Sequence, residues 1–340
     1  MILKKSGAKF ENAGMSRSII CTAILVTLAI VSGACRKAPK PIESNSAANA
    51  NTAQAVVVPT PTELFGPLRQ ADQEAVSKDP TNPANHYNLG NDYLADHHFK
   101  EAIDEFNTAL QLDPKNVDAL LQLGEAYFEM KDVPKAVEYW KQAQTIAPTN
   151  SEVLLKLGNA SLVQNQLDSA IDYFNQAAAA DPQNPLPLVK SGDLYLGRNE
   201  ITKSIDAYKQ AIKIKADYAD AWFNLGNAYD KSGQNEEQIA AFKKVVLINP
   251  KDSDAFFNLG NAYNKANKLQ DAIKAYGEAV KLKPDDVEAR RSLALVNIKA
   301  ANKAGAMEQY NALKDSQPAL AASLLQLIEN GGASHPGEKK

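Results

Sequence analysis

Apolar residues recur along residues 219–252 at the spacing of two consecutive helices. The first group lies at steps of three or four residues, on one helix face: Trp222, Leu225, Gly226 and Tyr229. After a break at Gly233 a second group has the same spacing: Ile239, Phe242, Val245 and Val246. Pro250 ends the second helix, because proline cannot continue a helix and restricts the residue before it. The pattern predicts a helix–turn–helix unit.

This unit recurs every 34 residues. Six glycines mark the same place in successive units, and Ala294 takes the seventh place: Gly90, Gly124, Gly158, Gly192, Gly226 and Gly260. The register predicts seven units: 83–116, 117–150, 151–184, 185–218, 219–252, 253–286 and 287–320. We further expect an N-terminal helix over 63–82, a C-terminal capping helix over 321–331 and a disordered tail over 332–340. Self-similarity at such a period is typical of a repeat array, whose units bury their apolar faces only against neighbours.

Four further positions agree between units. The eleventh position is aromatic in most units: Tyr93, Tyr127, Tyr195, Tyr229 and Tyr263. The twentieth is mostly alanine: Ala102, Ala136, Ala170, Ala272 and Ala306. The twenty-fourth is always aromatic: Phe106, Trp140, Phe174, Tyr208, Phe242, Tyr276 and Tyr310. A proline stands near the end of most units: Pro114, Pro148, Pro182, Pro250, Pro284 and Pro318.

These positions together resemble the tetratricopeptide repeat. The resemblance implies an all-α, right-handed superhelical solenoid, in which the small eighth residue lets two helices approach closely and the twenty-fourth aromatic fills the space between units. Ser191, Ser204 and Gln238 depart from the pattern, so we expect looser packing in the fourth and fifth units. Arg290 and Asn297 replace large apolar residues in the seventh unit, which predicts a solvated outer side there.

The N-terminus has the order of a secretory signal peptide over residues 1–34. Four basic residues precede an apolar run from Ile19 to Val31, and the small residues Ser32-Gly33-Ala34 follow. Cys35 comes next, so the segment resembles a bacterial lipoprotein signal, although Ser32 stands where that family usually has leucine. Three outcomes stay open: lipidation at Cys35, an uncleaved anchor, or plain secretion.

Residues 35–62 predict a disordered linker, because they are rich in Pro, Ala, Asn, Ser and Thr and have no helical or strand period. The expected location is therefore the bacterial cell envelope, facing the periplasm, with a membrane anchor through Cys35. Whether that membrane is the inner or the outer one stays open. A net charge of -3 makes nucleic acid an unexpected partner.

The residues do not predict an enzyme. The chain has two cysteines, Cys21 and Cys35, both near the N-terminus, so its folded part has no disulfide and no cysteine metal site. Its four histidines do not form a set of metal ligands in the sequence: His86, His97, His98 and His335. The sequence also contains no glycine-rich phosphate loop and no nucleophile elbow. We expect no cofactor, no metal and no small-molecule substrate.

The inner face of the superhelix is the predicted binding surface. In the family, positions five, six and nine of each first helix line it. Side-chain amides, which both donate and accept hydrogen bonds, suit an extended peptide. The candidate groove residues are Asn88, Asn91, Asn159, Asn224, Asn227, Asn258, Asn261, Tyr87, Phe223, Phe257, Lys156 and Lys190. Leu121, Leu155 and Val189 complete an expected apolar row at position five.

Two other interpretations of these residues stay open. Asparagine at positions six and nine is also the consensus residue of the family, so its presence indicates a typical repeat whether or not a ligand binds. Lys156 and Lys190 could pair with a ligand carboxylate, although the full pattern of family members that clamp C-terminal peptides is absent.

The predicted function is a non-catalytic scaffold that is tethered to the envelope and binds a protein or peptide in its concave groove. By analogy it resembles envelope lipoproteins that assist secretion, pilus or outer-membrane assembly. The alternative is an arm that presents substrate to, or regulates, a separate envelope enzyme.

Overall fold

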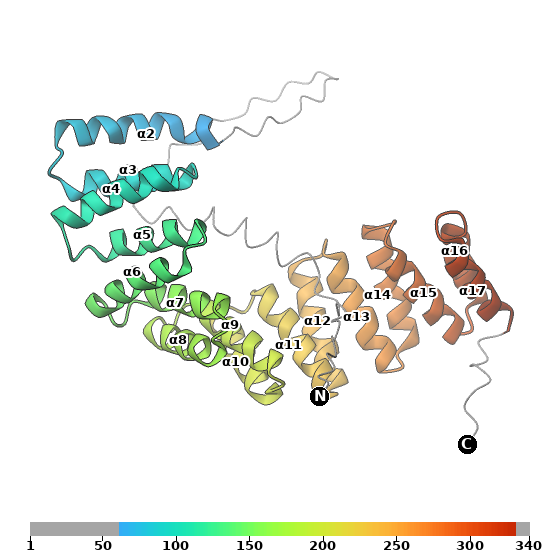
Figure 1. Ribbon diagram of the computed structural model, residues 1–340. Helices are drawn as coiled ribbons and strands as arrows, with labels where there is room; N and C mark the ends of the chain where they lie inside the picture. The colour runs from blue at the N-terminus through green and yellow to red at the C-terminus, as the bar shows by residue number, and fades with distance from the viewer. Residues whose placement is uncertain (1–60, 331–340) are drawn as a thin grey trace, which may run out of the picture. The chain divides into compact units, whose positions relative to one another are not determined.

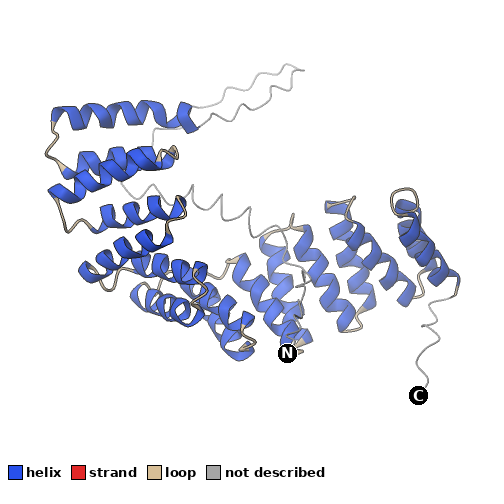
Figure 2. Ribbon diagram, viewed as in Figure 1, coloured by secondary structure: helices blue, strands red, loops and turns tan. Residues whose placement is uncertain are grey.

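The computed structural model describes the backbone of residues 61–330 and the side chains of residues 69–330. The predicted signal peptide, Cys35, the linker up to residue 60 and the tail over 332–340 lie outside this part. Within it the chain forms sixteen α-helices and no strand, as Figures 1 and 2 show. The predicted all-α class is confirmed.

The helices pack in chain order, and seven antiparallel pairs follow helix α2. The first helices of the pairs are α3 (Pro83–Ala95), α5 (Val117–Glu129), α7 (Ser151–Val163), α9 (Leu186–Gly197), α11 (Ala219–Ser232), α13 (Ser253–Lys265) and α15 (Val287–Lys299). The second helices are α4 (Phe99–Leu112), α6 (Val133–Ile146), α8 (Leu167–Ala180), α10 (Ile201–Ile214), α12 (Asn235–Ile248), α14 (Leu269–Leu282) and α16 (Lys303–Leu313). Helix α2 spans Pro61–Lys78, and helix α17 spans Pro318–Glu329, so α17 begins inside the stretch assigned to the seventh unit.

Polar residues before the first helices explain where these helices begin. Asn82, Asn116, Asn150, Asp252 and Asp286 each accept a hydrogen bond from a backbone N–H of the first turn. Such N-caps satisfy donors that have no partner inside the helix. They recur every 34 residues, so they set the start of most pairs.

The turn inside each pair also repeats. Its fifteenth residue has a left-handed backbone in every unit: His97, Lys131, Asn165, Asn199, Gly233, Asn267 and Ala301, with φ between 56° and 73°. This conformation suits glycine and asparagine better than other residues. Three asparagines and one glycine occupy four of the seven places, whereas His97, Lys131 and Ala301 adopt this conformation in the other three.

Close packing inside each pair depends on the repeated glycine. A Cβ atom added to Gly124 would lie 2.3 Å from the Trp140 side chain, and one added to Gly158 would lie 2.5 Å from Phe174. The twenty-fourth aromatic therefore contacts the glycine of its own unit. It also reaches the following unit, because Trp140 shares a core cluster with Val153 and Leu157.

The departures from the pattern are buried. Ser191 and Ser204 are 1% and 0% exposed, and their hydroxyls donate to backbone carbonyls of their own helices. Gln238 is 3% exposed and donates to Asp230. The expected solvated side of the seventh unit is wrong for Asn297, which is 2% exposed and donates to the Leu293 carbonyl. Local hydrogen bonds thus satisfy the donors of these polar side chains, although Gln238 Oε1 is buried without a hydrogen-bond partner in the described residues.

Candidate functional site

Positions five, six and nine of the first helices define what we call the first-helix face. Helix α3 contacts α5 directly, and α9 contacts α11, so these positions of neighbouring units lie close to one another. A side chain at position six can reach position nine of the preceding unit. The Lys156 ammonium lies 2.6 Å from the Glu125 carboxylate, and the Asn224 amide donates to Asp193 Oδ1 at 2.8 Å.

The aromatic residues at position five pack partly against aromatic residues of the core. The ring centroid of Phe223 lies 5.5 Å from that of Phe242, and the Phe257 centroid lies 5.7 Å from that of Tyr276. Tyr87 packs on Phe106 in the same way, at 6.1 Å. All three position-five rings keep part of their surface accessible.

The continuous apolar row expected at position five is wrong. Leu121 and Val189 are only 3% and 5% exposed. Their side chains belong to the clusters around Trp140 and Tyr208, so they are not available to a ligand. The accessible apolar side chains at this position are therefore Tyr87, Leu155, Phe223 and Phe257, interrupted by the buried Leu121 and Val189.

Two tyrosines of the core donate hydrogen bonds to polar side chains of the first-helix face. Tyr208 donates to Asp193 Oδ1 at 2.7 Å, and Tyr276 donates to Asn261 Oδ1 at 2.6 Å. Burial raises the pKa of both phenols, that of Tyr276 to about 12, so both remain protonated donors near neutral pH. Asn258 is also engaged, because its amide donates to a backbone carbonyl of its own helix at 2.7 Å.

Other predicted side chains of this face are unengaged. Asn88, Asn159 and Asn227 have no hydrogen-bond partner in the described part of the chain, and Lys190 has no ion pair there. Asn91 hydrogen-bonds with the Tyr87 hydroxyl. Of the two lysines expected to pair with a ligand carboxylate, Lys156 is already neutralised by Glu125. The unengaged groups on this face are thus three amides, and the Lys190 ammonium adds a charge that only the more distant Asp193 carboxylate attracts.

Asn159 and Lys190 occupy the same two positions in their units as the pairs that bond across the repeats. Lys190 is at position six, and Asn159 is at position nine of the preceding unit. Together they offer cationic and amide donors and one amide acceptor. A peptide carbonyl or carboxylate matches this combination.

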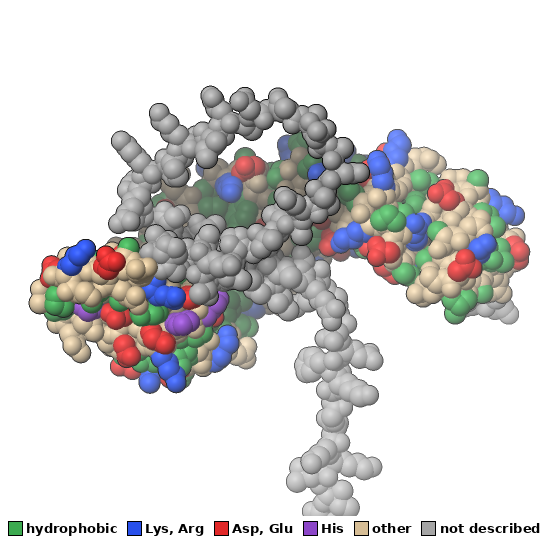
Figure 3. Space-filling view, turned by 90° about the horizontal axis from the view of Figure 1, so that it is seen from above, with side chains coloured by type: hydrophobic (Ala, Val, Ile, Leu, Met, Phe, Trp, Pro, Cys, Tyr) green, Lys and Arg blue, Asp and Glu red, His purple; other side chains and the backbone are tan. Residues whose placement is uncertain are grey.

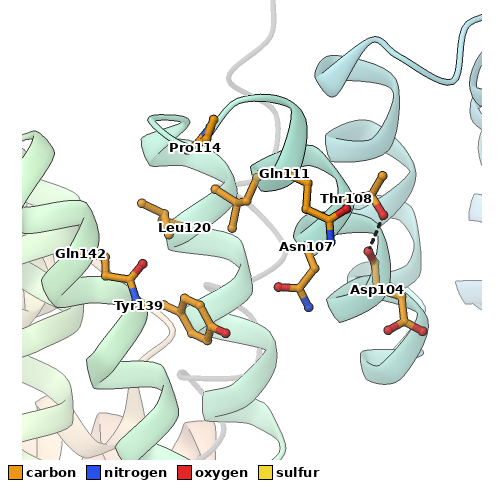
Figure 4. A pocket seen from close by; sticks show the side chains of 9 residues that line it. Asp104, Asn107, Thr108, Gln111, Pro114, Leu120, Tyr139 and Gln142 are labelled. Atoms are coloured by element: carbon orange, nitrogen blue, oxygen red, sulfur yellow. Dashed lines mark hydrogen bonds between the residues drawn. The ribbon is translucent and has the colours of Figure 1, made fainter.

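A surface depression that the sequence pattern missed lies between α4, α5 and α6. Its volume is about 630 Å³, and Figure 4 shows Asn107 and Gln111 of α4 facing Tyr139 and Gln142 of α6. A second depression of about 570 Å³ lies between α14, α15 and α16. Neither contains a predicted site residue. Their lining residues differ from unit to unit, so the period gave no signal for them.

The described residues contain no cluster of three or more His, Cys, Asp or Glu side chains that could hold a metal ion. His86 is 7% exposed, and its ring nitrogens contact Glu105 at 2.7 Å and the Pro80 carbonyl at 3.0 Å. It joins the first pair of helices to the preceding loop. On the face drawn in Figure 3, histidine side chains lie at one end of the array. Residues 61–330 also contain no helix long and apolar enough to span a membrane.

Models of one repeat family match the chain. Tetratricopeptide repeat models match residues 87–151, 132–190, 219–252 and 241–274, and a further TPR repeat model matches 192–233 and 260–299. Together they cover more than half of the chain. The protein therefore belongs to the tetratricopeptide repeat family.

One solved structure supports the fold. The C-terminal part of a TPR repeat-containing protein from Cytophaga hutchinsonii matches with a TM-score of 0.60 at 15% identity, over 70% of this chain and 99% of that one. A chain of the APC/C hetero-tetramer Cut9–Hcn1 matches with a TM-score of 0.49 at 19% identity, over 68% of this chain and 46% of that one.

YrrB, titled a TPR protein with an unusual peptide-binding site, matches with a TM-score of 0.48 at 18% identity, over 54% of this chain and 95% of that one. The comparison with curated proteins gives no match.

Proposed function

We propose that this protein is a non-catalytic scaffold that binds an extended segment of a partner protein on its first-helix face. One observation carries the proposal. Asn88, Asn159 and Asn227 have no hydrogen-bond partner in the described part, and Lys190 forms no ion pair there and has only a longer-range attraction to Asp193, whereas other polar residues of the face are bonded within the array. Tetratricopeptide repeats are typically scaffolds, which supports the same class of function.

The chemistry of the unengaged groups suits a peptide backbone. An extended chain presents N–H and C=O groups in alternation, and one side-chain amide can satisfy both kinds. Lys190 adds a positive charge for a carboxylate, either the C-terminus or an acidic side chain of the ligand. Tyr87 at one end and Phe223 and Phe257 toward the other offer partly exposed rings to apolar ligand side chains.

We also propose a cellular location for the protein. Cys35, placed directly after Ser32-Gly33-Ala34, supports lipidation and tethering to the cell envelope, with the array facing the periplasm. A Cys35→Ser variant tests it. We expect this variant to leave the membrane fraction for the soluble one. If it still sediments with membranes and gains no soluble form, lipidation at Cys35 is wrong.

A combined variant tests the binding face. We expect Asn159→Ala, Lys190→Ala and Asn227→Ala together to abolish capture of the wild-type protein's partners from envelope extracts, because three sets of unengaged donors are removed. The matched control carries Gln210→Ala, Lys274→Ala and Asn311→Ala, which removes the same groups from exposed places on second helices. Its partner list should equal that of the wild type. Equal losses in both variants, with circular dichroism unchanged, would rule out the first-helix face.

A further inference from the structure

Three departures from the repeat meet in the depression between α14, α15 and α16. Arg290, Asn297 and Gln309 line it, at positions four, eleven and twenty-three of the seventh unit. From the second to the sixth unit, position four is apolar: Leu120, Leu154, Leu188, Trp222 and Phe256. In the same units, position twenty-three is tyrosine or alanine: Tyr139, Tyr173, Ala207, Ala241 and Ala275. The seventh unit alone has polar side chains in place of the usual residues at all three positions.

Two glycines leave room beside these side chains. Gly277 of α14 and Gly305 of α16 both line the depression, whose volume is about 570 Å³. This volume falls in the range of roughly 300–1,000 Å³ that is usual for sites of small molecules. A Cβ atom at Gly305 would lie 2.5 Å from Asn297 Oδ1, so the buried amide of Asn297 requires a glycine there. The other units have longer side chains at this position: Glu101, Lys135, Ser169, Lys203, Glu237 and Asp271.

Arg290 fixes the orientation of the Gln309 amide. Its Nε donates to the Pro284 carbonyl at 2.6 Å, and its Nη1 donates to Gln309 Oε1 at 2.9 Å. A guanidinium only donates, so Gln309 must turn its oxygen toward Arg290 and its NH₂ group away from it. Gln309 is 3% exposed, and its NH₂ group donates to no acceptor in the described residues. A buried donor without an acceptor costs free energy, which a ligand with an acceptor oxygen would recover.

The guanidinium of Arg290 has no carboxylate to neutralise it. Arg290 is half-buried, and it forms no ion pair with a side chain of residues 69–330. Lys281 and Glu308 also line the depression, and Lys281 lies 3.3 Å from the Glu278 carboxylate outside the lining. The lining therefore has two cations and one carboxylate, which leaves a net charge of +1. An anion is attracted to such a site.

The lining selects a carboxylate among the anions. The planar fork of an arginine matches the two oxygens of a carboxylate, and an amide NH₂ group can donate to the same oxygens. A monoanion balances the net charge of the lining, whereas a phosphate dianion would leave negative charge in excess beside Glu308. Ile273 and Pro284 add accessible apolar surface to the lining, which suits a ligand with a short apolar body.

We propose that this depression is a second binding site, which holds the carboxylate of a small molecule with a short apolar body. The carboxylate accepts hydrogen bonds from the remaining N–H groups of Arg290 and from the NH₂ group of Gln309. The apolar body lies against Ile273 and Pro284. No lining residue stands at position five, six or nine of a first helix, so the site is separate from the first-helix face and independent of the scaffold function.

Titration of the full chain with butyrate tests the proposal. Side-chain NMR signals of Arg290 Nε–H and of the Gln309 NH₂ group report directly on the site. We expect both signals to shift until saturation with butyrate and to remain unchanged with butyramide, which has a similar shape but no charge. Equal shifts with butyramide, or no saturable shift with butyrate, would overturn the proposal. Tighter binding of inorganic phosphate than of butyrate would overturn the assignment to a carboxylate.

Two variants separate the site from general effects of the added salt. Arg290→Gln removes the cation, and Gln309→Glu places a carboxylate of the chain itself beside Arg290. Each should weaken butyrate binding by roughly tenfold or more, because charge-assisted hydrogen bonds are lost. Gln309→Glu keeps an acceptor for Arg290, so it provides the test if Arg290→Gln does not fold.

The neighbouring arginine provides a matched control. Arg291 is exposed on the same helix, and it lies 3.0 Å from the Glu288 carboxylate. Arg291→Gln removes the same charge outside the depression, so this variant should bind butyrate as the wild type does. Wild-type affinity for butyrate in a folded Arg290→Gln or Gln309→Glu variant, or an equal loss in Arg291→Gln, would show that the depression does not hold the carboxylate.

Discussion

Replacing Gly124 by alanine should destabilise the array more than the same change at any other repeat glycine. The new Cβ would lie 2.3 Å from Trp140 Nε1 and 2.6 Å from Cδ1 of the same ring. The indole cannot move away freely, because its Nε1 donates to the Leu121 carbonyl at 3.0 Å and the residue is 1% exposed. The substitution therefore forces either a clash or the loss of a buried hydrogen bond.

The change in the free energy of unfolding for Gly124→Ala is the balance of two costs and one gain. Overpacking a core costs about 1–3 kcal/mol, and a lost hydrogen bond costs about 0.5–1.5 kcal/mol. Alanine in place of a helical glycine gives back about 1 kcal/mol. We expect a net loss of about 1–3 kcal/mol in the free energy of unfolding for Gly124→Ala.

Two other glycines provide matched comparisons. A Cβ on Gly226 would lie 2.9 Å from Phe242, and one on Gly277 in the middle of α14 would meet nothing within 4 Å. Gly226→Ala should cost less than Gly124→Ala, and Gly277→Ala should stabilise by up to about 1 kcal/mol.

Urea unfolding followed by circular dichroism measures all three free energies. Tryptophan fluorescence adds local probes, because the chain has two tryptophans, Trp140 in the second unit and Trp222 in the fifth. If Gly124→Ala were as stable as the wild type, or if Gly277→Ala were destabilised equally, the contact of the eighth residue with the twenty-fourth would not be the packing rule of the array.

Further variants test local features, again by urea unfolding. Ala301→Gly should stabilise by about 0.5–1 kcal/mol, because φ is 56° at this residue, whereas Gly233→Ala at φ 73° should destabilise; the same sign for both would contradict the turn geometry. Asn297→Asp should destabilise by about 1–3 kcal/mol at pH 7, because it buries a charge and removes the donor to the Leu293 carbonyl. Burial raises a carboxyl pKa, so this penalty should shrink at pH 4.5, and a pH-independent penalty would refute the explanation.

The period of the sequence predicted the helix pairs because the same residues both mark the repeat and make its contacts. Gly124 and Trp140 are an example: each is visible as a repeated position, and each packs on the other. The helix bounds near Asn116 and Asn150 follow in the same way from N-caps that recur every 34 residues.

The binding face was only partly predictable, because its state depends on pairs of residues in different units. Asn224 and Asn258 occupy the same repeat position, yet Asn224 donates to Asp193 of the preceding unit, whereas Asn258 donates to the Asp254 carbonyl of its own helix. Position alone cannot distinguish an engaged amide from an unengaged one. The burial of Asn297 was missed for a similar reason, since its amide is satisfied by the Leu293 carbonyl and by Asn302, and Asn302 is not a repeated residue type.

The polar contacts of α2 were not predictable from the period, because α2 precedes the first unit and has no counterpart in the others. The ion pair of Arg69 with Asp96 and the hydrogen bond from Gln73 to Tyr93 follow only from the packing of α2 on α3. The surface depressions likewise arise from residues such as Tyr139 and Gln309, which share a repeat position but differ in type.

Site-specific photocrosslinking tests the central claim most directly. A photoreactive residue is placed at Asn159 or Asn227 on the first-helix face, and at Gln210 or Asn311 on second helices for comparison, in otherwise unchanged protein in the envelope. The proposal predicts that Asn159 and Asn227 crosslink to the same partner and that the second-helix positions do not. Crosslinks to a partner from Gln210 or Asn311 alone would contradict it.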